Sequence, residues 1–219
     1  MFEARKRYDT KLLDYIVTSN HIHLLVYDTG NRESIPKMMQ LIAGRTAQEY
    51  NCRITRKGAF WEDRYHATAV ETDEHLIRCI VYIDLNMVRA GVVKHPSDWK
   101  ESGYNEIQNP RKRYSIIDHG MLLHLLKKES MEDLKASHHN WVEQELAENR
   151  KNRQAKWSES MAVGSNEFVV EVKKQLCAGR IESDDEMFCL RETQKPFGAS
   201  LASFTPNETL NSYEWDVFS

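Results

Sequence analysis

Over its first hundred residues the chain alternates between short apolar, β-branched runs and longer segments whose apolar residues recur at helical spacing. Two of the short runs, residues 12–18 and 21–27, are separated by Ser19 and Asn20, residue types that tight turns favour. A charged stretch with the composition of a helix end precedes them. This pattern predicts the end of a helix followed by a β-hairpin.

Two helices are predicted after the hairpin. Residues 34–51 carry Pro36 in the first turn, where its missing N–H costs little. Residues 72–91 are the second helix, because Thr72 can cap the start and Gly91 is placed to terminate it. Both segments have apolar positions that would pack a helix on a sheet.

Between these helices, a basic tip at 52–58 leads into an aromatic, β-branched run at 59–70 that predicts a third strand. The order helix end, strand, strand, helix, strand, helix is most of a ferredoxin-like (RRM-like) split βαβ unit that lacks its opening strand. We therefore expect an α+β fold with an antiparallel sheet.

The rest of the chain divides into two further parts. Residues 1–108 contain the unit just described, and residues 109–180 contain helical pieces, the last with Ser165 as a candidate N-cap. Residues 181–219 are acidic, rich in Ser, Thr and Asn, and weakly periodic. We expect a mostly helical C-terminal region and then a flexible tail.

Charge and composition narrow the functional classes only in part. The formal net charge is −3, but residues 181–219 contain eight acidic and two basic residues, so the remainder of the chain is mildly basic. The overall charge therefore neither supports nor excludes a polyanionic ligand.

The four cysteines lack C-x-x-C spacing, which argues against a structural zinc site and a disulfide framework. Because neither a membrane-spanning run nor a secretory pattern is found, we expect a cytoplasmic protein without a membrane partner.

The stretch SNHIHLLV places His21 and His23 on one face of a strand, because side chains repeat on a face every second residue. Two imidazoles side by side can chelate a metal. On the predicted helix 72–91, Tyr82 and Asn86 are one turn apart and Arg89 is one turn further. With the amide oxygen of Asn86 as a third ligand, the set suits Mg²⁺ or Mn²⁺ acting on a phosphate that Tyr82 could attack.

Each of these features also has a purely structural interpretation. An H-x-H pair on a strand is more often packed or hydrogen-bonded than metal-binding, and a tyrosine on an amphipathic helix is usually a core residue. Asn86 and Arg89 suit solvent-facing positions near a helix end. Residue types and spacing leave both interpretations open.

Three stretches carry a family resemblance: YIVTSNHIHLLV, GAFWEDRYHATAV and VYIDLNMVRAGVVKHPSDWKESGY. Over roughly residues 1–105 they resemble the single-tyrosine HUH (His-hydrophobe-His) transposases, in particular the IS200-like and REP-associated tyrosine transposases of bacteria. The resemblance implies that His21, His23 and Asn86 hold a divalent metal. It also implies that Tyr82 cuts single-stranded DNA and becomes joined to the 5′ phosphate.

The resemblance implies a DNA partner: single strands folded into imperfect hairpins and bound through phosphates and stacked bases. A weaker similarity around residues 153–176 implies a helix-turn-helix-like DNA-binding element. Besides Arg89, the candidate phosphate contacts are Arg53, Arg56, Lys57, Arg64, Arg111, Lys112 and Arg113, and the candidate stacking surfaces are Trp61 and Tyr65. The alternative for each is a solvated charge or a packed aromatic ring. The sequence leaves open whether the protein is a monomer or a homodimer.

Two departures from the family pattern stand out. Thr18-Ser19 replaces a common Met-Pro, and Asn86-Met87 replaces Asn-Pro, but both changes retain the catalytic side chains. The family fold also opens with a strand and a helix before the hairpin, where this chain has about a dozen residues. That strand is central, beside the histidine strand, and its absence would leave buried backbone unpaired. A start codon assigned too far downstream, a decaying gene fragment, or replacement of the strand by another part of the chain would each explain it.

The leading hypothesis is a metal-dependent transposase that nicks and rejoins single-stranded DNA. Its alternative is a truncated or domesticated binder of hairpin DNA without turnover, in which Tyr82→Phe would leave DNA binding and the biological effect unchanged. A third hypothesis, a metal-dependent enzyme acting on small molecules, is disfavoured because the sequence has no second pair of ligands at comparable spacing.

Overall fold

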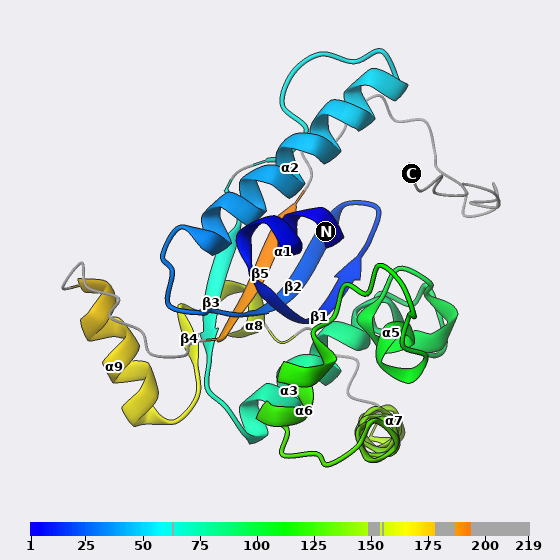
Figure 1. The fold of residues 1–219 in the computed structure, drawn as a ribbon, viewed down its shortest axis with the longest axis vertical. Helices are drawn as coiled ribbons and strands as arrows, with labels where there is room; N and C mark the ends of the chain where they lie inside the picture. Colours follow the sequence, from blue (N-terminus) through cyan, green and yellow to red (C-terminus); the bar gives the residue numbers. More distant parts are fainter. Residues whose placement is uncertain (63, 149–153, 155, 178–186, 194–219) are drawn as a thin grey trace.

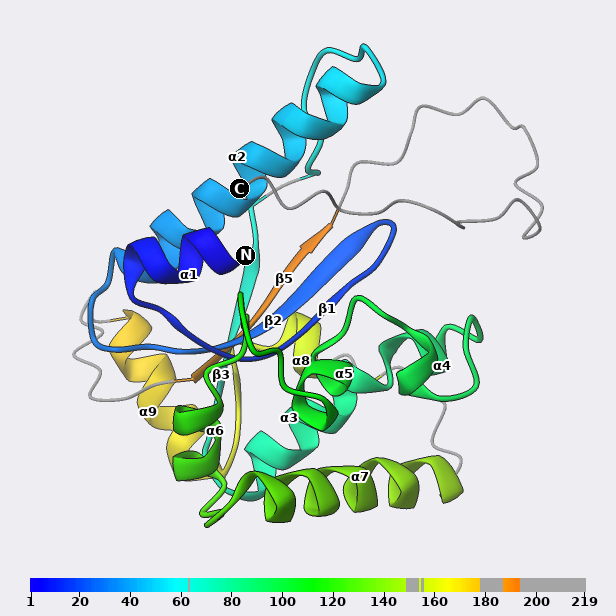
Figure 2. The ribbon, with the colours of Figure 1, turned by 45° about the vertical axis from the view of Figure 1, so that its right-hand side comes forward.

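A central sheet with helices on both sides forms the body of the protein, which a computed structural model describes over residues 1–62, 64–148, 154, 156–177 and 187–193 (Figures 1 and 2). The first elements are α1 (Phe2–Tyr8), β1 (Lys11–Val17), β2 (His21–Tyr27), α2 (Ser34–Arg53) and β3 (His66–Val70). They are followed by α3 (Glu74–Asp84), α4 (Asn86–Arg89), the 3-10 turn η1 (Pro96–Asp98), α5 (Gly103–Gln108), α6 (His119–Leu125) and α7 (Met131–Ala147). The last are α8 (Lys156–Glu159), β4 (Ala162–Val163), α9 (Asn166–Cys177) and β5 (Met187–Thr193). No helix in these ranges is long and apolar enough to cross a bilayer.

The strands lie in the order β1-β2-β5-β3-β4. The first four are antiparallel neighbours, and the short β4 runs parallel to β3. β5 comes from the far end of the chain, yet it lies in the middle of the sheet (Figure 1, orange). All seven of its residues pair with β2, from Met187 opposite Tyr27 to Thr193 opposite His21. It also pairs with β3 along the whole length of that strand.

The position of β5 corrects two expectations. The place between the hairpin and β3, where an opening strand was expected to be missing, is filled, so the inner edges of β2 and β3 have backbone partners. Because this strand comes after the helices and not before the hairpin, the order along the chain departs from the ferredoxin-like split βαβ unit. Residues 187–193 are also a strand, where we expected a flexible tail. The rest of that predicted tail lies outside the described residues.

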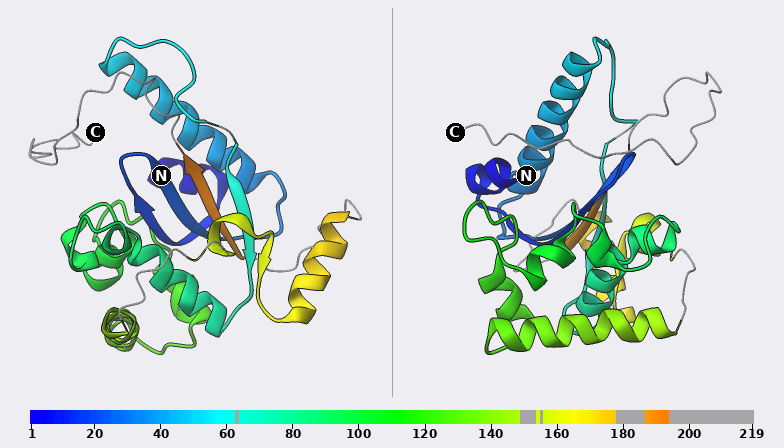
Figure 3. Two further views of the ribbon diagram at one scale, coloured as in Figure 1. Left: turned by 180° about the vertical axis from the view of Figure 1, so that it is seen from behind. Right: turned by 90° about the vertical axis from the view of Figure 1, so that its right-hand side faces the viewer.

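The sheet separates two layers of helices. Figure 3 (right panel) shows α1 and α2 on one side, and α3, α7 and α8 on the other. Side chains alternate along β2, so His21 and His23 face α3 while Leu24 and Val26 face the opposite layer. Leu24 and Val26 have no exposed surface and belong to the main hydrophobic core. β2 is thus buried on both faces, which fixes the orientation of its histidines.

The predicted hairpin is confirmed, and the third strand is shorter than predicted. The N–H of Thr18 donates to the carbonyl of His21 across the Ser19-Asn20 turn at 2.9 Å. β3 begins at His66 and not at residue 59. The preceding aromatic residues are used in packing: the Phe60 ring lies 4.7 Å from that of Tyr50 on α2.

The predicted helix 72–91 is divided into α3 and α4, which flank Leu85. Asp73 occupies the N-cap position in place of Thr72, and no side-chain bond caps this end. Gly91 has φ 71° and follows α4, as a terminating glycine should. In the C-terminal region helical pieces are present as expected, and Ser165 caps α9 by accepting from the N–H of Phe168 at 3.2 Å.

A buried polar pair fastens α7 to the end of α3. His138 and Asp84 side chains are 1% and 0% exposed, and their Nε2 and Oδ2 atoms lie 2.7 Å apart. The amide of Gln108 donates to His138 Nδ1 at 3.0 Å, so Nε2 carries the ring proton and donates to the carboxylate.

Removal of His138 should therefore be costly. His138→Ala leaves the Asp84 carboxylate buried without its donor, and we expect the free energy of unfolding to fall by about 3 kcal/mol or more. His139→Ala is the matched control, because the His139 side chain is 52% exposed, and it should cost less than about 1 kcal/mol. Urea denaturation of both variants tests this, and equal losses would contradict it.

Candidate metal and nucleophile site

The three predicted metal ligands converge where β2 faces the start of α4. The rings of His21 and His23 lie 5.1 Å apart, centroid to centroid, at an interplanar angle of 84°. His21 Nε2 lies 3.3 Å from the amide oxygen of Asn86, although the two residues are 65 positions apart in the chain. His23 is buried and His21 is half-buried, so the set lies at the border between the core and the surface.

The hydrogen bonds of His21 show that this donor set suits a cation. Its Nδ1 lies 2.7 Å from the side-chain oxygen of Asn20 and 3.1 Å from the Thr18 hydroxyl, and the tautomer with the proton on Nδ1 satisfies the Asn20 oxygen, which only accepts. The Nε2 atom of the neutral ring then presents a lone pair toward the Asn86 oxygen, which is itself an acceptor. In this tautomer both atoms are acceptors, and a cation held by the two would satisfy both lone pairs. An imidazole and amide set of this kind fits Mg²⁺ or Mn²⁺.

Tyr82 lies next to these ligands, held by aromatic and cationic neighbours. Its ring meets that of His23 edge to face at 6.1 Å, and Trp157 of α8 packs against it at 6.0 Å. The Arg89 guanidinium lies 4.0 Å from the ring centroid and donates to the backbone carbonyl of Tyr82. Tyr82 is only 6% exposed, so packing on several sides fixes the ring beside the histidine pair.

Arg89 is half-buried instead of facing solvent. Burial lowers the pKa of its guanidinium, while the neighbouring Tyr82 acts in the opposite direction. A guanidinium keeps its proton despite such a shift, so a positive charge is held against the ring of the candidate nucleophile.

A pocket of about 130 Å³ opens beside Tyr82, and its lining includes Arg78, Arg89, Glu145 and Lys156. Sequence reasoning missed Arg78, Lys156 and the ring of Trp157. The spacing contained part of the signal, since Arg78 precedes Tyr82 by one helical turn and shares its face. The contribution of α8 depends on tertiary packing that no local pattern reveals.

Apart from Arg89, the predicted phosphate contacts lie in two segments: the projecting end of α2 with the loop that leads to β3, and the loop after α5 (Figure 2). At the α2 end, Arg53 pairs with Glu49 at 3.0 Å and Arg56 donates to the Ala59 carbonyl. Lys57 lies in the loop that follows α2, and Arg64 lies two residues before the start of β3. In the loop, Arg111 lies 3.6 Å from Glu106, and Lys112 and Arg113 are exposed.

The two candidate stacking residues are less open than expected. Trp61 is half-buried against the core, and its indole N–H donates to the Ala43 carbonyl at 2.9 Å. Tyr65 is likewise half-buried against the core. Each ring is therefore used in packing, and only the remaining exposed part could contact a base.

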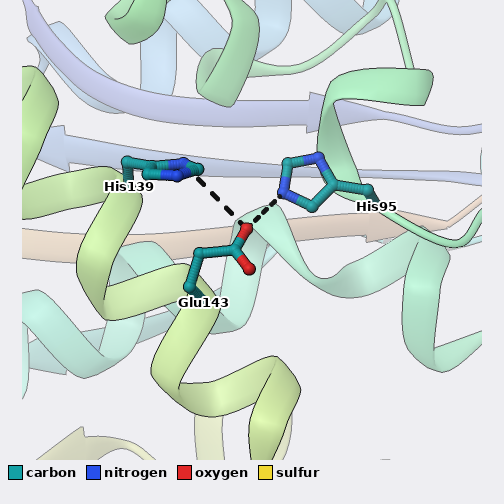
Figure 4. A group of neighbouring side chains, drawn as sticks. All are labelled: His95, His139 and Glu143. Carbon is teal, nitrogen blue, oxygen red and sulfur yellow. Dashed lines mark hydrogen bonds and ion pairs between the residues drawn. The ribbon is translucent and has the colours of Figure 1, made fainter.

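A second group of metal-type side chains lies between η1 and α7: His95, His139 and Glu143 (Figure 4). His95 Nε2 is 3.0 Å from a Glu143 carboxylate oxygen, and the backbone N–H of Ser97 donates to His95 Nδ1. The Tyr104 hydroxyl lies 3.2 Å from His139 Nδ1. Because each of these ring nitrogens already has a protein partner, the group acts as a hydrogen-bonded link between η1 and α7.

Comparison with protein-family models matches residues 1–86 to the family described as transposase IS200 like. Comparisons with curated proteins and with solved structures gave no match. The matched segment contains the hairpin, α2, β3 and α3, and it ends at Asn86. It therefore includes both histidines and the tyrosine whose arrangement is described above. Over these residues the chain is similar to the IS200-like transposases.

Proposed function

We propose that this protein nicks and rejoins single-stranded hairpin DNA through a covalent 5′-phosphotyrosine at Tyr82, assisted by Mg²⁺ or Mn²⁺ held by His21, His23 and Asn86. The similarity of residues 1–86 to the IS200-like transposases favours a transposase acting on DNA. The proposals of a phosphotyrosine intermediate and of a bound metal rest on the arrangement of His21, His23, Asn86 and Tyr82. The observation that carries them is the approach of His21 Nε2 and the Asn86 oxygen to 3.3 Å, with the Tyr82 ring 6.1 Å from that of His23.

In the proposed step the phenol oxygen of Tyr82 forms a bond to phosphorus while the bond from phosphorus to the 3′ oxygen breaks. The phenol loses a proton and the departing oxygen gains one, so the products are a 5′-phosphotyrosine ester and a 3′ hydroxyl. Rejoining is the reverse attack by a 3′ hydroxyl. A bound divalent ion would polarise the phosphate. The protein's own part is to hold the phenol in place, which the contacts with Trp157 and Arg89 support.

The burial of Tyr82 favours a second candidate function. With 6% of its surface exposed, the tyrosine offers little access to a strand in the described structure. A binder of hairpin DNA without turnover would tolerate such burial. Covalent chemistry at Tyr82 separates the two functions, because only the enzyme forms a protein–DNA adduct.

The test is incubation of the purified chain with labelled single-stranded hairpin oligonucleotides from around its own gene, with Mg²⁺ or Mn²⁺, followed by a denaturing gel. We expect a slower-migrating covalent adduct that requires the metal. The absence of an adduct with every oligonucleotide, together with measurable binding, would favour the non-catalytic binder.

The metal ligands give a separate prediction. His21→Ala should weaken Mn²⁺ binding, measured by titration calorimetry, by at least about tenfold, since it removes a direct ligand. Adduct formation should fall in parallel. His124→Ala is the control, because His124 is exposed on α6. If both variants bind Mn²⁺ like the parent, the ion is held elsewhere.

A further inference from the structure

Arg89 is a half-buried cation that has no acidic partner among the described residues. Its contacts are the face of the Tyr82 ring and the Tyr82 carbonyl. A guanidinium offers five N–H donors, and these contacts leave most of them unused. The carboxylates of Glu145 and Asp84 act on the Arg89 charge only from a distance, and the unused donors of a half-buried guanidinium favour a bound anion.

Two further cations share the pocket with Arg89. Lys156, at the start of α8, lies 4.9 Å from the centroid of the Trp157 ring and has no ion pair within the described ranges. Burial lowers its pKa, and the nearby charge of Arg78 lowers it further. Arg78 pairs with Glu74 at an exposed site. Glu145 also lines the pocket, so three basic side chains and one acidic side chain meet there.

We propose that this pocket binds one phosphate of the single-stranded nucleic acid, next to the phosphate that Tyr82 attacks. The volume of about 130 Å³ and the planar donors of Arg89 suit a phosphate group. The proposal rests on the proposed function for its substrate. It assigns DNA contacts to residues of α8, which lie outside the matched residues 1–86. It also gives a role to Lys156, which lines the pocket with Tyr82, and to Trp157, which packs on the Tyr82 ring.

The experiment measures DNA affinity against salt concentration in the Tyr82→Phe background, where cleavage cannot interfere. The probe is a fluorescein-labelled single-stranded hairpin oligonucleotide, followed by anisotropy. Loss of one phosphate contact should reduce the slope of log K against log salt by about 0.7 for Lys156→Gln. The affinity at low salt should fall by roughly tenfold. Lys6→Gln, the same charge change at an exposed position of α1 on the other side of the sheet, should alter neither quantity.

Arg89 supplies a second variant. Arg89→Gln should reduce the slope as Lys156→Gln does, and Arg89→Lys should restore it because the charge returns. If Arg89 only supports the tyrosine structurally, neither variant changes the slope. Inorganic phosphate is the competitor that identifies the source of the anion. If it raises the melting temperature of the parent while Lys156→Gln leaves the DNA slope unchanged, the pocket takes free phosphate and the proposal is overturned.

The remaining outcomes distinguish the proposed phosphate-binding pocket from the proposed DNA cleavage at Tyr82. A reduced slope for Lys156→Gln in a protein that never forms an adduct supports the pocket and removes the proposed catalysis. Equal slopes for Lys156→Gln and Lys6→Gln overturn the pocket proposal even where the adduct forms. A parent without affinity for the oligonucleotide overturns both proposals.

Discussion

Replacing Tyr82 by phenylalanine should abolish the covalent protein–DNA adduct and leave DNA binding intact. The substitution removes one oxygen, the proposed nucleophile, and retains the ring that contacts His23, Trp157 and Arg89. The fold should therefore be preserved, and the expected loss of adduct is complete, because a benzyl side chain has no atom that can attack phosphorus. The measurement is a denaturing gel of protein with 5′-labelled and 3′-labelled hairpin strands.

Tyr50→Phe is the matched control for this experiment. Tyr50 lies on α2, in the helix layer on the other side of the sheet from Tyr82, and its ring packs against Phe60. Loss of its hydroxyl should therefore leave adduct formation unchanged. An adduct that persists in Tyr82→Phe would place the nucleophile elsewhere. A parent that binds hairpin DNA as tightly as Tyr82→Phe, and forms no adduct, would identify the non-catalytic binder.

Introducing a proline at Leu190, in the middle of β5, should unfold the sheet around the histidines. Leu190 pairs with Leu24 on one side and with Ala67 on the other. Proline removes a backbone donor and does not fit a central strand, so we expect a cost of about 3 kcal/mol or more. The loss of strand pairing should also disrupt the candidate metal site, because His21 and His23 lie on β2, which pairs with β5. Urea unfolding and hydrogen exchange of the β2 amides measure the two effects.

Leu190→Val controls for the change of side chain. It keeps the backbone N–H and introduces a β-branched side chain that suits a strand, and it should cost no more than about 1.5 kcal/mol. In Leu190→Pro the amides of β2 should exchange rapidly and Mn²⁺ binding should be lost. If the proline variant unfolds at the same urea concentration as the valine variant, β5 does not occupy the place between β2 and β3.

The local parts of the fold and site could be predicted because their signals lie within a few residues. The period of two put His21 and His23 on one face, and the turn residues between the apolar runs defined the hairpin. The spacing of four put Tyr82 and Asn86 near each other, and their helix is interrupted at Leu85 without separating them from the histidines. Steric and hydrogen-bond preferences of single segments are sufficient for such features.

Three features depend on contacts between residues that are distant in the sequence: the central strand β5, the packing of Trp157 on Tyr82, and the buried Asp84–His138 pair. Residues 187–193 follow an acidic stretch with weak periodicity, and nothing local shows that they pair with a strand more than 150 positions earlier. They lie between β2 and β3 because the inner edges of those two strands carry buried backbone N–H and C=O groups, which must be hydrogen-bonded. In the same way, His138 and Trp157 acquire their roles only when α7 and α8 pack against α3. Side-chain periodicity therefore determines which residues point together within one element, and the competition of whole elements for unpaired edges and apolar faces determines which elements meet.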